Sequence, residues 1–146
     1  MERVVVALVL ALAAVAVALV LRRRRPDAPT QPRLYAVPTQ LDRADFDRPD
    51  AAWLVAVFTS AGCESCAGAV ARAAPLDSPQ VCVQELEIGV RPELHDRYGI
   101  DAVPTVVVAD ADGVVRASFV GPPPAADLWA AVAEVRDGGG SSPPDP

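Results

Sequence analysis

The chain has 146 residues, enough for one domain of ordinary size with short extensions. Three cysteines in a chain of this length exclude a small fold that depends on several disulfides. All 13 basic residues are arginine, and the chain has 19 acidic residues, so the formal net charge is −6. Beyond residue 25, only 8 arginines remain against 18 acidic residues. This acidic body argues against a nucleic-acid partner, because phosphate binding needs clustered positive charge.

An apolar segment opens the chain. Residues 4–21, from Val4 to Leu21, are all alanine, valine or leucine. As a helix, these eighteen residues span about 27 Å, close to the roughly 30 Å thickness of a bilayer core. A helix with no polar side chain has no face for water, which argues against a place in a soluble core. Residues 1–25 therefore predict one transmembrane helix with an arginine-rich flank.

Four arginines, residues 22–25, follow the apolar segment at once. A cleaved secretory signal has its basic residues before the apolar run, whereas positive charge next to a membrane span stays in the cytoplasm. We therefore expect an uncleaved single-pass anchor in the cell membrane, with the C-terminal domain facing the cytoplasm. An extracytoplasmic domain is the alternative.

Two proline-rich stretches bound the body of the chain. Residues 26–32 hold three prolines and are expected to form an extended linker. Residues 137–146 contain three glycines, two serines and three prolines and are expected to be a disordered tail. The predicted domain spans residues 33–136 between them.

The body alternates segments of strand and helix character. Residues 53–59 and 105–109 are continuous apolar runs, which are typical of strands covered on both faces. Asp112-Gly113 predicts a hairpin after the second run. The other expected elements are strands at 34–37, 81–86 and 114–120 and helices at 63–74, 91–98 and 125–135. This order predicts an α/β fold with a central mixed β-sheet flanked by helices.

Two cysteines three positions apart directly follow the first apolar strand. Cys63 and Cys66 lie at the start of an expected helix, where unpaired backbone N–H groups and the helix dipole favour a thiolate. A thiolate is the attacking species in disulfide exchange. We therefore expect Cys63 to be the nucleophile and Cys66 the resolving thiol; a purely structural pair is the alternative. No zinc site is expected, because the sequence has no second cysteine or histidine pair.

A second motif, Tyr98-Gly99-Ile100-Asp101-Ala102-Val103-Pro104-Thr105, leads into the apolar strand at 105–109. A CxxC pair at a strand-to-helix junction, followed by this segment, an Asp-Gly hairpin and a strand ending at Gly121, resembles the thioredoxin-like family. The resemblance covers residues 33–136. It implies a thioredoxin-like fold in which Pro104 follows a cis peptide bond, packs beside the cysteine pair and lets the Val103 backbone pair with a bound substrate chain.

The residues around the cysteines depart from the family pattern. Gly62 stands where thioredoxins usually have tryptophan, and Glu64-Ser65 replace the familiar Gly-Pro between the cysteines. Glu64 is expected to have two opposing effects, one on the helix and one on Cys63. It suits the N-terminus of a helix, but as a neighbouring negative charge it disfavours the Cys63 thiolate.

A second departure concerns the buried aspartate that the family places beneath its cysteines to relay the proton of the resolving thiol. By the resemblance, this aspartate would fall at Val57, and its lysine partner near Gln84 or Glu85. The loss of acid and base together is chemically coherent, because a buried charge without its partner is costly.

The remaining candidates have ordinary structural interpretations. Cys82, in an alternating strand, is expected to be a small core residue, with a redox-sensing thiol as the alternative. His95 is expected at the surface of a charged helix. The inner stripe of the last helix is expected to consist of Leu128, Trp129, Val132 and Val135.

Together these features predict a membrane-anchored thiol–disulfide oxidoreductase that acts through Cys63 and Cys66. Its expected partners are protein disulfide or dithiol substrates and an upstream reductant. No metal or organic cofactor is expected, and the domain is expected to be monomeric. Two alternatives remain: a thioredoxin-fold binding or scaffold module with little turnover, and an extracytoplasmic thioredoxin-like reductase.

Overall fold

The computed structural model of the chain describes residues 35–138. The predicted membrane span, arginine flank and linker, and most of the predicted tail, lie outside these residues. Within the described part, no helix combines the length and the apolar character that crossing a membrane requires.

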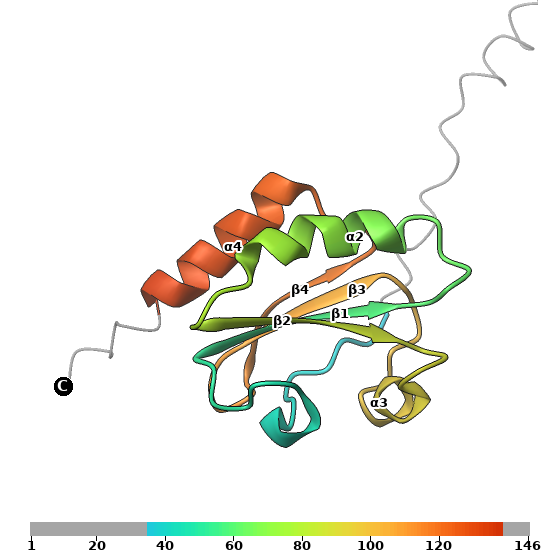
Figure 1. Cartoon of the computed structure of the whole chain (residues 1–146), viewed down its shortest axis with the longest axis horizontal. Coiled ribbons are helices and arrows are strands. Elements are labelled where there is room, and N and C mark those ends of the chain that lie inside the picture. Colours follow the sequence, from blue (N-terminus) through green and yellow to red (C-terminus); the bar gives the residue numbers. More distant parts are fainter. Residues whose placement is uncertain (1–34, 139–146) are drawn as a thin grey trace, which may run out of the picture. The chain divides into compact units, whose positions relative to one another are not determined.

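Four strands and three α-helices make up the described domain (Figure 1). The strands are β1 (Trp53–Thr59), β2 (Val81–Glu87), β3 (Thr105–Ala109) and β4 (Val115–Val120). The α-helices are α2 (Cys66–Ala73), α3 (Pro92–Arg97) and α4 (Ala125–Gly138). Two short 3-10 helices, η1 (Arg43–Asp45) and η2 (Ala74–Leu76), complete the order.

The strands form one mixed sheet in the order β2-β1-β3-β4, so the predicted architecture is confirmed. β1 runs parallel to β2 and antiparallel to β3, and β3 is antiparallel to β4. The register places Val57 beside Glu85 and Thr59 beside Glu87. Because β1 and β2 are parallel, their carboxyl ends meet at the same edge of the sheet.

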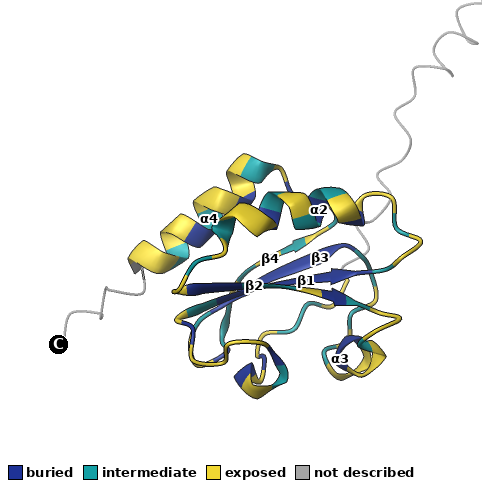
Figure 2. Cartoon of the chain, in the orientation of Figure 1, coloured by how far each residue is buried: buried dark blue, intermediate teal, exposed yellow. Residues whose placement is uncertain are grey.

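The two faces of the sheet are covered by different elements (Figure 1). We call the side covered by α2 and α4 the helix-pair face, and the side covered by α3 and the η1 segment the α3 face. Figure 2 shows β1 and β3 buried along their lengths between these layers. Alternate residues of each strand supply the two cores, as the pleat of a strand requires.

The hairpin between β3 and β4 forms where the Asp-Gly pair predicted it. Gly113 adopts φ 79°, and a Cβ placed there would lie 1.9 Å from the Leu41 carbonyl oxygen. The Leu41 N–H donates to the Gly113 carbonyl at 2.8 Å, so the chain that enters the domain lies directly against the hairpin. Glycine is therefore required at this position both by conformation and by space.

Several sequence-based expectations are wrong in detail. Residues 35–37 of the expected edge strand at 34–37 form no strand, and this part of the chain contributes only an isolated bridge between Gln40 and Val114. The helix after the cysteines begins at Cys66 rather than at 63. The last helix runs to Gly138, so the first two residues of the expected disordered tail are helical.

Two side chains lie opposite to where they were expected. His95 is only 2% exposed, because α3 packs both Leu94 and His95 against the sheet. Trp129 is 46% exposed, while Leu128 and Val132 on the same helix are buried. The Trp129 indole N–H donates to the Arg72 carbonyl at 2.8 Å, so this ring lies across the surface of α2 instead of entering the core.

Candidate active site

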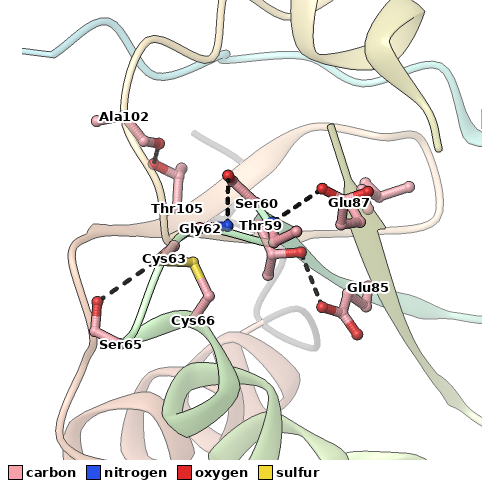
Figure 3. Close-up of a disulfide and its surroundings, with 12 residues drawn as sticks. Thr59, Ser60, Gly62, Cys63, Ser65, Cys66, Glu85, Glu87, Ala102 and Thr105 are labelled. Atoms are coloured by element: carbon pink, nitrogen blue, oxygen red, sulfur yellow. Dashed lines mark hydrogen bonds between the residues drawn. A yellow bond between two sulfur atoms is a disulfide. The ribbon is translucent and has the colours of Figure 1, made fainter. Parts of the chain in front are cut away.

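Cys63 and Cys66 form a disulfide between β1 and the start of α2, with their Cα atoms 5.4 Å apart (Figure 3). Cys66 is 3% exposed, whereas Cys63 is partly exposed. This asymmetry agrees with the order of attack expected from the sequence. The accessible sulfur can meet a partner, and the buried sulfur can reach only its neighbour.

The local hydrogen bonds explain how the chain reaches this geometry. β1 ends at Thr59, and the Cys63 N–H donates to the Ser60 carbonyl at 3.1 Å, which closes a turn. The Cys66 N–H then donates to the Cys63 carbonyl at 3.2 Å, and the helix begins. Cys63 therefore lies in the turn before α2, three residues earlier than the first helical residue, and not within the first helical turn as expected.

The two residues between the cysteines are exposed, as is Gly62 just before them. Ser65 is the N-cap of α2 but makes no side-chain cap hydrogen bond. Its Oγ instead lies 3.7 Å from the Cys63 Sγ (Figure 3). Gly62, Glu64 and Ser65 thus form the outer surface of the turn, next to the partly exposed sulfur.

The segment at 102–105 lies beside the disulfide turn (Figure 3). Thr105 pairs with Phe58 near the end of β1, and this pairing brings the residues just before β3 to the same edge of the sheet as the turn. The peptide bond between Val103 and Pro104 is cis, as the resemblance implied. Pro104 is buried and accepts a hydrogen bond from the Gly121 N–H at 2.7 Å.

Two glutamates from the end of β2 also contact this edge. The Thr59 hydroxyl, on a residue that is 1% exposed, donates to Glu85 Oε1 at 2.8 Å. The Ala61 N–H donates to Glu87 Oε1 at 3.0 Å (Figure 3). Glu87 was not among the residues expected at this edge. The alternation Glu-Leu-Glu in a strand parallel to β1 was the available signal, because it predicts two glutamates on one face at the sheet edge.

Val57 lies on the helix-pair face and is 1% exposed among aliphatic side chains. Its neighbour across the strand pair is Glu85, which is exposed. The position at which the resemblance implies an aspartate is therefore apolar, and the exposed Glu85 beside it on the adjacent strand accepts the Thr59 hydrogen bond.

The third cysteine is separate from this site. Cys82 is buried in the core of the α3 face, and its Sγ donates to the Asp47 carbonyl at 3.0 Å. Burial raises the pKa of the Cys82 thiol. The expectation of a small core residue is confirmed. Across residues 35–138 we also find no group of three or more histidine, cysteine or acidic side chains placed to hold a metal ion.

Comparisons with known proteins support the fold assignment. No protein-family model matches the sequence, and no curated protein matches it either. Among solved structures, a thioredoxin-fold protein from Helicobacter pylori superposes with a TM-score of 0.54 at 17% identity, covering 62% of this chain and 73% of that one. The thioredoxin of Fasciola hepatica superposes with a TM-score of 0.51 at 21% identity, covering 57% of this chain and 81% of that one.

A structure described as a malarial protein is also similar, with a TM-score of 0.52 at 14% identity, covering 57% of this chain and 96% of that one. Sequence identities at this level support a shared fold but not a shared activity. The strand order, the disulfide between β1 and α2, and these likenesses agree with one another, and the described domain has a thioredoxin-like fold.

Proposed function

We propose that this protein is a thiol–disulfide oxidoreductase that exchanges electrons with protein substrates through Cys63 and Cys66. The observation that carries the proposal is the disulfide between a partly exposed and a buried cysteine, three residues apart, at the edge where β1 meets α2. A structural disulfide in a core has both sulfurs enclosed, whereas a reactive one must present a sulfur to its partner.

The exchange runs in two steps when the reduced protein meets a substrate disulfide. The Cys63 thiolate attacks one substrate sulfur, a mixed disulfide forms, and the other substrate sulfur leaves as a thiolate that takes up a proton. Cys66 then loses its proton and attacks the Cys63 sulfur. The substrate leaves with two thiols, and the Cys63–Cys66 disulfide has formed. Two electrons and two protons have passed to the substrate, and a dithiol protein or a small thiol restores the starting state.

The surface around Cys63 supplies the contacts for a protein substrate. Gly62, Glu64 and Ser65 are exposed in the turn that carries the sulfur, and the segment from Ala102 to Thr105, which contains Val103 and Pro104, lies beside this turn (Figure 3). Within residues 35–138, the backbone of Val103 takes part in no backbone hydrogen bond. Its N–H and C=O are therefore free to pair with an extended substrate chain, which is the role the resemblance implies for this residue.

Insulin reduction by dithiothreitol tests the proposal. The parent protein should accelerate the precipitation of insulin, and Cys63→Ser should abolish this acceleration because it removes the attacking sulfur. Cys82→Ser is the matched control, since it also removes one thiol but from the opposite core. Equal rates for the parent and Cys63→Ser would contradict the proposal.

A binding module with little turnover is the second candidate. The buried Val57 favours it, because the resemblance implies a proton-relaying aspartate at this position and a valine cannot take the proton of Cys66. The Cys66→Ser variant separates the two candidates. In an oxidoreductase this variant retains the substrate as a mixed disulfide on Cys63, and the complex resists denaturant but is released by dithiothreitol. A binding module retains partners that denaturant alone removes.

The proposal includes a tether. Eighteen apolar residues followed by four arginines support an anchor that holds the domain at the cytoplasmic side of the membrane. A C-terminal fusion to alkaline phosphatase tests the orientation, because this enzyme is active only after export. We expect an inactive fusion; high phosphatase activity would place the domain on the extracytoplasmic side instead.

A further inference from the structure

The two edge strands of the sheet, β2 and β4, differ in how their outer backbone groups are satisfied. An edge strand presents a row of unpaired N–H and C=O groups that another strand can bind. At β2, charged side chains occupy these groups. The Val83 N–H donates to Asp77 Oδ1 at 3.0 Å, and the Arg48 guanidinium donates to the Val81 carbonyl at 3.1 Å. The outer backbone groups of β2 therefore already have partners.

β4 leaves the backbone of two residues without partners on its outer side. The Gly121 N–H donates to the Pro104 carbonyl at 2.7 Å, and Phe119 occupies the next bonded position against β3. Bonded and non-bonded pairs alternate along an antiparallel ladder. The N–H and C=O groups of Ser118 and Val120 consequently point away from β3. Among residues 35–138, no hydrogen bond from outside the sheet reaches them.

The chain that enters the domain covers only the beginning of β4. The Val115 N–H donates to the Thr39 carbonyl at 3.0 Å. Pro38, the next residue of the entering chain, has no N–H to continue the ladder. The register of β4 against β3 also shifts at Arg116, and such a bulge commonly ends pairing. The second half of the strand is thus left open at its outer edge, and Val120 there is 42% exposed.

These open groups are complementary to a second copy of themselves. If a copy lies antiparallel, with a twofold axis at Phe119, Ser118 of each chain lies opposite Val120 of the other. Each of these two pairs exchanges both of its N–H···O bonds. Phe119, which is partly buried on the helix-pair face, then lies opposite the same residue of the second copy. Aromatic side chains directly opposite each other on neighbouring strands stabilise the pairing.

Charge and composition favour a second copy as the occupant. Residues 117–121 carry no charge, and the neighbouring Arg116 pairs with Asp110 of its own chain at 2.7 Å. Two such edges meet without like charges directly opposite each other, which would oppose the pairing. The flanking segments of the same chain are poorer candidates. Residues 26–32 and 139–146 each contain three prolines, which cannot donate to a ladder.

We propose that two copies of this protein pair through β4, antiparallel about Phe119, and join their four-stranded sheets into one. The interface is isologous, because the same strand of both copies forms it. The backbone supplies the hydrogen bonds, and Phe119 and Val120 supply the apolar contacts. This dimer replaces the monomer expected from the sequence, and it does not depend on the exchange chemistry of the cysteine pair.

Disulfide cross-linking of the full chain tests both the pairing and its register. Copies with Ser118→Cys are coexpressed with differently tagged copies with Val120→Cys, and intact cells are oxidised with diamide. All copies also carry Cys63→Ser and Cys66→Ser, so that their own dithiol cannot reduce the new bond. Opposite residues of a bonded pair have Cα atoms about 5.5 Å apart, within disulfide range, whereas like residues lie on the diagonal, about 7–8 Å apart. Linked pairs of unlike copies should therefore exceed linked pairs of like copies about tenfold.

The matched control uses a second exposed valine. Val90 is 73% exposed in the loop after β2, and Val90→Cys coexpressed with Ser118→Cys should give no linked pairs. Ser118 and Val120 are themselves exposed, so the fold should tolerate both cysteines.

A lysine at the edge provides a test without new cysteines. Energy transfer between two fluorescent tags at the C-terminus reports pairing in cells. Val120→Lys should reduce this transfer to the level of random encounters, because it places a charge on the shared edge of both copies. Val90→Lys should leave the transfer unchanged.

Predominance of unlike linked pairs, together with loss of transfer in Val120→Lys, would support the dimer. Equal amounts of like and unlike pairs, or no linked pairs at all, would overturn it. Energy transfer in Val120→Lys equal to that of the parent would also overturn it, since copies would then associate without this edge.

Discussion

The two faces of the sheet differ in what they bury. On the helix-pair face, the hydrophobic cluster consists of alanine, valine and leucine, and the buried Thr59 and Cys66 lie at its edge near the disulfide. On the α3 face, the core includes two phenylalanines and a cysteine, and the buried Arg43 and His95 lie among them. The disulfide belongs to the first face, and the buried Arg43 and His95 belong to the second. The chemistry of this domain is therefore separated by the sheet from the polar network that shapes the rest of the core.

The polar groups of the α3 face serve the architecture. The Arg43 guanidinium donates to the carbonyl oxygens of Asp110 at 2.8 Å and Ala51 at 3.0 Å. Burial lowers the pKa of Arg43, because desolvation disfavours its charged form. These bonds connect the entry segment of the domain to the end of β3 and to the residues just before β1. The charge of Arg43 is stabilised by these backbone oxygens.

A charge placed on the aliphatic helix-pair face tests the difference between the two faces most severely. Val57→Asp should lower the free energy of unfolding by about 4 kcal/mol at pH 7, because an ionised carboxylate without a partner is costly to bury. Urea denaturation monitored by circular dichroism measures the change. Val57→Asn is the matched control of similar size without charge and should cost about 2 kcal/mol. An aspartate variant as stable as the asparagine variant would show that this face accepts a charge after all.

The second test compares two neighbouring residues of α4. Leu128 is fully buried on the helix-pair face, and Trp129 is 46% exposed. Leu128→Ala should destabilise the domain by about 3 kcal/mol through lost burial and the cavity left behind. Trp129→Ala should cost about 1 kcal/mol, since the larger ring loses mainly surface contacts and its hydrogen bond to Arg72. Thermal and urea unfolding of both variants measure the two losses of stability. A larger loss for Trp129→Ala than for Leu128→Ala would show that the tryptophan is part of the core.

Arg43 provides the third test, now on the α3 face. Arg43→Met keeps the length and apolar character of the side chain but leaves the buried carbonyl oxygen of Ala51 without its donor, while the Asp110 carbonyl keeps only the Gly113 N–H. We expect a loss of about 2 kcal/mol in the free energy of unfolding, from the unsatisfied buried acceptor and the lost second bond. Arg116→Met, which removes an exposed partner of Asp110, is the control and should cost less than about 1 kcal/mol. A methionine variant of Arg43 as stable as the parent would show that the guanidinium contributes nothing to the fold.

Sequence patterns were sufficient for the sheet and for the cysteine pair. The runs at 53–59 and 105–109 are apolar apart from Thr59 and Thr105, and a strand covered on both faces can bury nearly every residue of such a run. Cys63 and the segment ending in Val103-Pro104 lie in loops, and Cys66 begins α2, all at one edge of the sheet, so their order along the chain was enough to bring them together. These features are local or depend on strand pairing alone.

The errors arise where packing decides between neighbouring positions. Trp129 lies next to Leu128, and one position along a helix turns a side chain by about 100°, so the two cannot both face the core centre. His95 is buried beside Leu94 because the six-residue α3 packs its middle against Phe58 and Leu86, and the His95 Nε2 lies 2.8 Å from the Leu86 carbonyl oxygen. A charged helix sequence contains no sign of that single acceptor. The start of α2 depends likewise on turn hydrogen bonds that composition does not specify.

Tyr98 provides the smallest expected effect and a dependence on pH. Its hydroxyl donates to Asp45 and accepts from the Asp42 N–H at 3.0 Å, which connects α3 to the η1 segment. Burial, followed by the bond to Asp45, raises the pKa of Tyr98 to about 12. Since the unfolded value is about 10, the neutral phenol is favoured by folding. Its contribution is complete below pH 10 and is lost as the pH rises from about 10 to 12.

Tyr98→Phe should therefore cost about 1 kcal/mol at pH 7, from the loss of both hydrogen bonds, and should flatten the alkaline decline in stability. Urea denaturation from pH 7 to pH 11 gives the difference between parent and variant, which should shrink above pH 10 because the parent alone loses a neutral buried phenol. Burial also raises the pKa of the Cys82 thiol, but Cys82 is present in both proteins and its contribution cancels in the difference. Tyr35→Phe, at a side chain that is 41% exposed, should show neither effect. If the free energy of unfolding of the parent and of the Tyr98 variant depended on pH in the same way, the bonds from Tyr98 to Asp42 and Asp45 would not connect α3 to the η1 segment.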